Sequence, residues 1–196
     1  PAKTHSYKYY TEAMERYKQS YALALEKDYW ANVRTLVAEM DGSQVDDYSR
    51  QFDYVNASLD KETTFALLHN SNKAYNTEIN DLLLTALGRA YYRLTQKKEV
   101  SIQLEGHGRE SINEPLEIDR TVGWFTSVYP LALTGLGSDI RTDIRNTKET
   151  LHAIPNKGVG YGQLFGMDCH KAPMIGFNYH GEFSEGGGEN FQFFSL

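Results

Sequence analysis

The chain has 196 residues and a mass of 22.3 kDa, which is the usual size of one domain. Its 40% hydrophobic and 23% charged residues exclude wholesale disorder, and its net charge of −6 argues against a broad electrostatic grip on nucleic acid or anionic lipid. The single cysteine, Cys169, excludes an intramolecular disulfide and a multi-cysteine metal site. No signal peptide and no apolar run of roughly 18 residues is found, so we expect a cytoplasmic protein without membrane contact.

The first 40 residues carry apolar side chains at helical spacing. Tyr10, Met14, Tyr17 and Tyr21 predict a helix over about 6–25. A second helix is expected to end at Asp41-Gly42-Ser43, with a break or bend at 26–28 between the two. The apolar set of this second helix is Trp30, Val33, Leu36, Val37 and Met40.

The middle of the chain mixes both kinds of element. Alternation around Phe52 and Tyr54 predicts a half-buried strand over 50–58, and Asp60 is placed to cap a short helix over 61–68. The most regular apolar pattern lies over 78–94, a helix for which Asn76 and Thr77 are the expected caps.

From residue 100 onward, strand and helix patterns again alternate. Residues 100–105 predict a strand with an apolar face and a polar face of Ser101, Gln103 and Glu105. Because Pro130 cannot donate a ladder hydrogen bond, it is expected at an edge, bend or strand end of an extended segment. The further predicted elements are the extended segment 121–134, a helix over 138–154 and a strand over 174–179. Interspersed helices and strands indicate an α/β or α+β architecture.

Two other clusters favour structural interpretations. The glycines at 158–162 lack the preceding strand of a dinucleotide fingerprint, so we expect a backbone turn or a close contact there. Asp168, Cys169 and His170 are of metal-binding types, but no second ligand pair is spaced to complete a tetrahedral site. We therefore expect a surface loop and no metal.

The segment Glu105-Gly106-His107-Gly108-Arg109-Glu110 places four ionisable side chains between glycines at the end of a predicted strand. A strand end can hold a carboxylate at a cleft, and glycines let the backbone approach a substrate closely. The alternative is a polar turn in which Arg109 pairs with a carboxylate, and spacing alone favours that alternative. Tyr179 would by default be a core tyrosine or a buried hydroxyl donor.

Several segments occur together in one order, and this series resembles the epimerization domains of nonribosomal peptide synthetases. The resemblance covers roughly 76–183 and extends to Tyr29-Trp30 near the start. One difference is His180, where the family usually has leucine. The segments are DLLLTALG at 81–88, EGHGRE at 105–110, RTVGWFTSVYP at 120–130, PNKGVGYG at 155–162 and FNYHG at 177–181.

The resemblance implies a fold similar to chloramphenicol acetyltransferase, with two α/β lobes, each a mixed sheet flanked by helices. Residues 1–196 would form a single domain, the carboxy-terminal lobe. The family's amino-terminal lobe carries an HHxxxDG motif, and no His-His pair occurs in this sequence. We therefore expect a fragment of a multidomain synthetase from which the amino-terminal lobe is absent.

For chemistry, the resemblance implies inversion of the α-carbon of an L-aminoacyl or peptidyl thioester to the D form. The thioester would be held on the phosphopantetheine arm of a peptidyl carrier protein, and no cofactor would bind the chain directly. Glu105 would be the general base or acid, and Tyr179 would donate a hydrogen bond or proton near the enolate. The supporting motif residues would be Gly106, His107, Gly108, Arg109, Glu110, Arg120, Trp124 and Asn178.

Within the loop, we expect His107, Arg109 and Glu110 to shape the backbone and to hold the charge state of Glu105. Two other functions stay open: a non-catalytic module that docks a carrier protein, and one lobe of an amide-forming condensation domain. The sequence EGHGRE followed by RTVGWFT is typical of epimerization rather than condensation domains.

Overall fold

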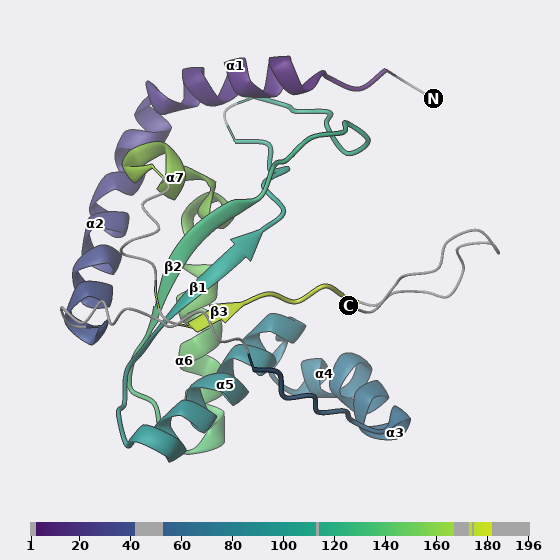
Figure 1. Cartoon of the computed structure of the whole chain (residues 1–196), viewed down its shortest axis with the longest axis vertical. Coiled ribbons are helices and arrows are strands. Elements are labelled where there is room, and N and C mark those ends of the chain that lie inside the picture. Colours follow the sequence, from purple (N-terminus) through teal and green to yellow (C-terminus); the bar gives the residue numbers. More distant parts are fainter. Residues whose placement is uncertain (1–2, 42–52, 113, 167–172, 174, 182–196) are drawn as a thin grey trace.

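A computed structural model of the chain describes residues 3–41, 53–112, 114–166, 173 and 175–181. Helices and strands are interspersed along it, as predicted (Figure 1). In chain order the elements are α1 (Tyr7–Lys18), α2 (Tyr21–Asp41), α3 (Lys61–Phe65), the π-helical turn η1 (Ala66–Asn70), α4 (Ser71–Tyr75), α5 (Ile79–Thr95), β1 (Val100–Gly106), β2 (Ser127–Leu133), α6 (Ile140–His152), the 3₁₀ turn η2 (Pro155–Gly158), α7 (Val159–Phe165) and β3 (Ile175–Phe177).

The three strands form a mixed sheet in the order β2-β1-β3. Strand β1 pairs antiparallel with β2 from Val100↔Leu133 to Gly106↔Ser127, and it pairs parallel with β3 through Leu104↔Phe177. Helices α2, α6 and α7 contact β2, and α5 packs along α6 (Figure 1). The expected α/β class, a mixed sheet flanked by helices, is confirmed.

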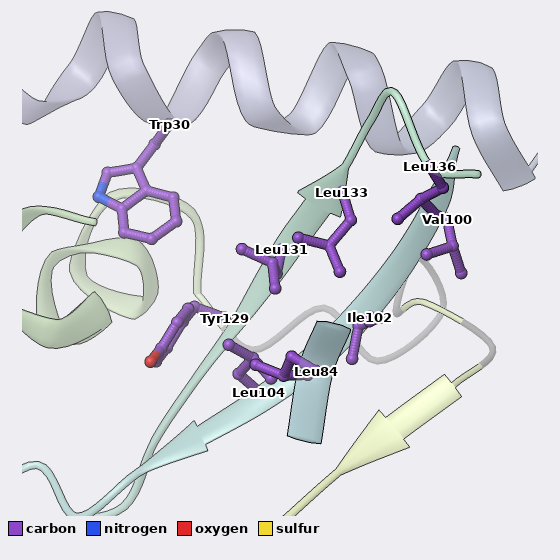
Figure 2. Packing of buried hydrophobic residues seen from close by; sticks show 9 residues of the cluster. All are labelled: Trp30, Leu84, Val100, Ile102, Leu104, Tyr129, Leu131, Leu133 and Leu136. Carbon is purple, nitrogen blue, oxygen red and sulfur yellow. The ribbon is translucent and has the colours of Figure 1, made fainter. Parts of the chain in front are cut away.

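The core is built on one face of the β1–β2 pair. Val100, Ile102 and Leu104 lie in register with Leu133, Leu131 and Tyr129, so both strands present these side chains to the same side. Trp30 of α2 is fully buried and meets the Tyr129 ring edge-on at 5.9 Å (Figure 2). Burying a side chain of this size stabilises the fold by about 2–3 kcal/mol.

The face opposite this core was expected to be polar. Glu105 at the end of β1 is indeed exposed, but Ser101 near its start is buried. Ser101 pairs across the sheet with Ala132, which is also buried. The polar face is therefore open only toward the carboxyl end of the strand.

The break between the first two helices lies at Gln19–Ser20, so the prediction of a break at 26–28 is wrong. Ser20 begins the new helix because its hydroxyl accepts a hydrogen bond from the Leu23 amide at 3.2 Å. Residues 26–28 stay helical, and Glu26 among them is buried and accepts hydrogen bonds from Tyr17 and Trp30.

The predicted strand over 50–58 is wrong for its described part. Residues 53–58 form no regular structure, and Tyr54 is 82% exposed, because alternation without a partner strand does not make a sheet. Residues 50–52 lie outside the described residues. Asp60 caps α3 as predicted by accepting from the Thr63 amide.

The expected caps of α5, Asn76 and Thr77, are also wrong. The helix begins at Ile79 with a reciprocal capping box between Glu78 and Asp81. Asn76 is instead the left-handed residue that ends α4.

The carboxy-terminal part follows the predictions more closely. Asp139 caps α6, and Pro155 begins the η2 turn that follows it. The glycine-rich segment forms helix α7 after a left-handed Gly158, whose close contact with Tyr129 would leave a Cβ only 2.0 Å from the ring. Strand β3 confirms the strand predicted over 174–179, in a shorter form.

Of the described residues, no helix combines the length and the apolar character needed to cross a membrane. Within the same ranges, no group of three or more metal-ligating side chains is gathered. Asp168, Cys169 and His170 lie outside the described residues, so the surface loop expected there stays a prediction.

Buried tyrosines make the stability of this fold sensitive to alkali. Burial, together with the hydrogen bond to Glu26, raises the pKa of Tyr17, and burial next to Tyr129 raises the pKa of Tyr29 to about 12. Both hydroxyls ionise near pH 10 in an unfolded chain, so above that pH the unfolded state binds fewer protons than the folded state. Their contribution to stability is therefore complete below about pH 10 and is lost as the pH rises toward their folded pKa.

We expect the free energy of unfolding, measured by urea titration, to fall steadily between about pH 10 and pH 12. Tyr17→Phe should lower stability at neutral pH but flatten this alkaline fall. A fall of the same slope in the variant and the unmodified chain would contradict the assignment to Tyr17.

Candidate active site

The motif segments meet where β1 and β3 end. These strands are parallel, so their carboxyl ends lie at one edge of the sheet, with Glu105 and Asn178 one residue beyond the paired Leu104 and Phe177. The Asn178 side-chain amide donates a hydrogen bond to Glu105 Oε2 at 3.0 Å, across 73 positions of sequence. Tyr179 follows directly and is half-buried, whereas Glu105 is exposed. The structure thus brings Glu105 together with Asn178, and Tyr179, the other residue to which the resemblance assigned chemistry, is the neighbour of Asn178 in the chain.

Two glycines at and after the end of β1 pack closely against the following part of the chain. A Cβ on Gly106 would lie 2.7 Å from Ser127 Oγ, which is buried and has no hydrogen-bond partner among the described residues. Gly108 has φ +67°, and a Cβ there would lie 1.6 Å from the Phe125 carbonyl oxygen. A larger residue at 108 would meet both the backbone strain and the clash. The glycines therefore serve close backbone packing in this loop.

Arg109 links this loop to the segment that follows it. Its guanidinium donates to the carbonyl oxygens of Ile118 and Thr121, the latter at 2.9 Å, and lies 3.9 Å from the centre of the Phe125 ring. The partners are thus backbone carbonyls and an aromatic face rather than the carboxylate that the polar-turn interpretation expected. One side chain holds 109, 118, 121 and 125 together.

The segment 121–125 is fixed from its other side by α1. Phe125 is buried and meets the rings of Tyr7 and Tyr10 edge-on at 5.2 and 4.7 Å. The Tyr7 hydroxyl donates to the Trp124 carbonyl oxygen at 2.9 Å, and the Tyr7 ring covers Gly123, where a Cβ would lie 2.4 Å from it. The Trp124 side chain itself is 78% exposed.

The remaining motif residues lie at the surface of the loop. His107 accepts a hydrogen bond from the Arg109 amide at Nδ1 (3.0 Å), and its Nε2 lies 3.2 Å from Glu110 Oε1. This pattern fits the neutral Nε2–H tautomer. The negative charge of Glu110 adds to burial in raising the pKa of Tyr129, and Arg120 is exposed in the turn before Thr121.

Two hollows of the described surface lie elsewhere. One, of about 450 Å³, is lined by α5, and the other, of about 740 Å³, lies between Tyr75 and α6. Neither contains a residue of the motifs around Glu105 and Asn178. In the described part of this chain, Glu105 and Asn178 at the sheet edge are both exposed.

Sequence reasoning missed a buried polar cluster that lies behind this edge. Glu26 is 5% exposed and accepts hydrogen bonds from Tyr17, Trp30 and Asn156. The sequence did contain one indication of this cluster: Glu26 lies four residues before Trp30. This spacing places the Glu26 carboxylate on the apolar stripe of α2.

Gly108→Ala should destabilise the chain by about 2–4 kcal/mol, because it combines a left-handed backbone with overpacking against Phe125. The matched control is Gly162→Ala in α7, where a Cβ would meet nothing within 4 Å and a gain of about 0.4–1 kcal/mol is expected. Urea unfolding of both variants measures the difference. Equal free energies of unfolding for the two variants would contradict the close contact between Gly108 and Phe125.

Comparison with known proteins gives consistent results. The profile of the Condensation domain family matches residues 1–192. Surfactin synthase subunit 1 of Bacillus subtilis (strain 168) is 40% identical over 199 residues, covering 94% of this chain and 6% of its own length. Bacitracin synthase 3 of Bacillus licheniformis is 40% identical over 190 residues, covering 92% of this chain and 3% of its own length. The chain thus spans only a small part of these relatives.

Solved structures show the same relationship. The epimerization domain from the third module of tyrocidine synthetase B superposes with a TM-score of 0.68 and 37% identity, over 84% of this chain and 38% of that one. The first condensation domain of the calcium-dependent antibiotic synthetase, in complex with a substrate analogue, superposes with a TM-score of 0.59. Its identity is 16%, over 90% of this chain and 40% of that chain, so it shows a common fold alone. The chain therefore belongs to the Condensation domain family of the nonribosomal peptide synthetases.

Proposed function

We propose that the chain is the carboxy-terminal lobe of an epimerization domain, which inverts the α-carbon of an aminoacyl or peptidyl thioester on a carrier protein. The observation that carries the proposal is the hydrogen bond from Asn178 to Glu105. It joins the EGHGRE and FNYHG motifs at one sheet edge and leaves the Glu105 carboxylate exposed there. The 37% identity to the epimerization domain of tyrocidine synthetase B supports the same activity.

The geometry suits removal of an α-proton. A thioester acidifies its Cα–H, and abstraction then needs a base whose position is held. The amide of Asn178 orients Glu105 from one side, at Oε2 (3.0 Å), and an ionised carboxylate has further lone pairs with which to accept a proton. Glu105 is the proposed base or acid at one face of the α-carbon.

Negative charge that develops on the thioester oxygen must be stabilised while the α-carbon is planar. Tyr179 is one residue beyond Asn178 at the same edge, and its phenol is a hydrogen-bond donor. We assign it to the enolate oxygen or to a proton returned nearby. Inversion also needs a proton at the opposite face, for which the histidine of an HHxxxDG motif in an amino-terminal lobe is proposed.

The remaining motif residues would keep this edge in place. Arg109 fixes the loop after Glu105 through the Ile118 and Thr121 carbonyls, and Tyr7 fixes Gly123 and Trp124 from α1. The open edge of the described chain is where we place the second lobe, so that the two lobes enclose the substrate. The phosphopantetheine arm of a peptidyl carrier protein would deliver the thioester to it.

A second candidate is the corresponding lobe of a condensation domain, which would form an amide bond. It is favoured by the common fold with the condensation domain of the calcium-dependent antibiotic synthetase. The loop sequence EGHGRE and the 37% identity to an epimerization domain favour the first candidate.

The test is exchange of the α-proton in heavy water on an aminoacyl-pantetheinyl carrier protein, followed by mass spectrometry. The chain would be assayed alone and together with its amino-terminal lobe. We expect exchange only with both lobes, and a loss of at least about 100-fold in Glu105→Gln, because the amide cannot accept the proton. The matched control is Glu99→Gln, an exposed carboxylate just before the opposite end of β1, which should keep full activity.

Absence of exchange with both lobes present, while the carrier protein still binds, would contradict the proposal and favour a docking module. Amide formation with an acceptor amine under the same conditions would favour the condensation candidate.

A further inference from the structure

The carboxylate of Glu26 is buried in a pocket made of hydrogen-bond donors. Trp30 Nε1 donates to Oε2 at 3.0 Å, Asn156 Nδ2 donates to Oε1 at 2.7 Å, and the Tyr17 hydroxyl also donates to Oε1. An indole N–H can only donate, and Asn156 Nδ2 also donates to the Tyr17 oxygen at 3.3 Å, which directs the hydroxyl proton toward Glu26. The pocket is therefore complementary to an acceptor that carries no proton of its own.

One of these donors comes from a turn with an unfavourable backbone. Asn156 (φ 44°), Lys157 (φ 50°) and Gly158 (φ 81°) are three consecutive left-handed residues, of which only glycine adopts this conformation freely. Such a turn persists only where its surroundings hold it. The side chain of Asn156, bound to Glu26 and Tyr17, is the polar contact that holds it to α1 and α2.

The same turn lies against the end of β1. The Lys157 carbonyl oxygen would be 3.2 Å from a Cβ on Gly106, the residue after Glu105. Gly158 packs so closely on the Tyr129 ring that a Cβ would lie 2.0 Å from it, and Tyr129 is the cross-strand partner of Leu104. The turn thus lies against β1 just after Glu105 and against the β2 residue that pairs with Leu104, just before it.

We propose that Glu26 is a positioning residue: through Asn156 it fixes the 156–158 turn behind Gly106 and thereby sets the position of the Glu105 carboxylate. Glu26 takes no part in proton transfer. The inference rests on the proposed function only for its effect on catalysis, since the mechanical link is a property of the fold. The buried position of Glu26 also explains why residue 160 is a glycine, because a Cβ there would lie 2.1 Å from Glu26 Oε2.

Amide hydrogen exchange on the full chain tests the link without any assay of activity. In Glu26→Gln the new NH₂ group faces a donor in either orientation, so the turn should loosen. We expect exchange to accelerate at least about tenfold at 106–108 and 156–160, with no matching change in the middle of α5. Equal acceleration everywhere would reveal loss of global stability alone and would overturn the proposal, as would unchanged exchange at 106–108.

Two further variants separate positioning from stability. Tyr17→Phe removes one donor from the same carboxylate and the longer Asn156–Tyr17 contact, but it keeps the 2.7 Å bond from Asn156 to Glu26, so exchange at 106–108 should accelerate less than in Glu26→Gln. Glu26→Gln combined with Asn156→Asp exchanges the amide and the carboxylate, which restores donors opposite acceptors and should restore slow exchange at 106–108. Failure of the double variant to recover these amides would overturn the proposal.

The effect on catalysis is tested with the two lobes together in the α-proton exchange assay. Glu26→Gln should lower kcat at least about tenfold with little change in KM, and the double variant should regain most of it. If Glu26→Gln accelerates amide exchange at 106–108 but the unmodified chain with both lobes shows no α-proton exchange, the proposed function would be contradicted and the link between Glu26 and Gly106 would stand. Unchanged kcat in a Glu26→Gln protein with accelerated exchange at 106–108 would overturn the positioning role.

Discussion

The parallel pairing of β1 with β3 is the constraint on which the rest of the site depends. Parallel strands place their carboxyl ends at one edge of the sheet. Strand pairing alone therefore makes neighbours of two motifs that are 73 residues apart in the sequence. The antiparallel partner β2 then supplies the other side of β1 and carries Tyr129, on which the turn at Gly158 packs. A carboxylate placed at the end of a strand that is paired on both sides has little freedom to move, which is what chemistry at a fixed atom requires.

Most of the motif residues around that edge are there for architecture rather than for contact with a substrate. The Arg109 guanidinium donates to two backbone carbonyls and lies over an aromatic ring. Gly108 and Gly123 lack the Cβ that would collide with the Phe125 carbonyl and the Tyr7 ring, respectively. The buried Tyr17 and Glu26, joined to Asn156 of the η2 turn by hydrogen bonds, tie that turn to α1 and α2. The exposed carboxylate of Glu105 thus lies on a tightly packed frame, and substitutions in the frame should act on its position.

The sequence predicted elements well where periodicity was long and uninterrupted, as in α5, α6 and β1. It failed where a tertiary partner decided the outcome. Residues 53–58 alternate like a strand but pair with no strand among the described residues. Residues 26–28 were expected to separate two helical patterns, although they lie inside one helix and Glu26 is buried against three donors. The pairing of Glu105 with Asn178 could be suspected only from the family resemblance, since no local rule relates positions 73 residues apart. Asp60, by contrast, was readable as a local capping group from its immediate neighbours.

Pro130 in β2 has a consequence for the outer edge of the described sheet. It lies opposite Gln103, and because proline has no N–H, this must be a pair whose backbone groups point away from each other. Gln103 then directs its own groups toward β3, whereas Pro130 presents a ring where an incoming strand would need a donor. Within the described part of the chain, β2 is an outer strand, so the proline leaves a gap in the row of donors there. An extended segment from a second molecule would find no continuous ladder along β2, which protects this side of the sheet from edge-to-edge aggregation.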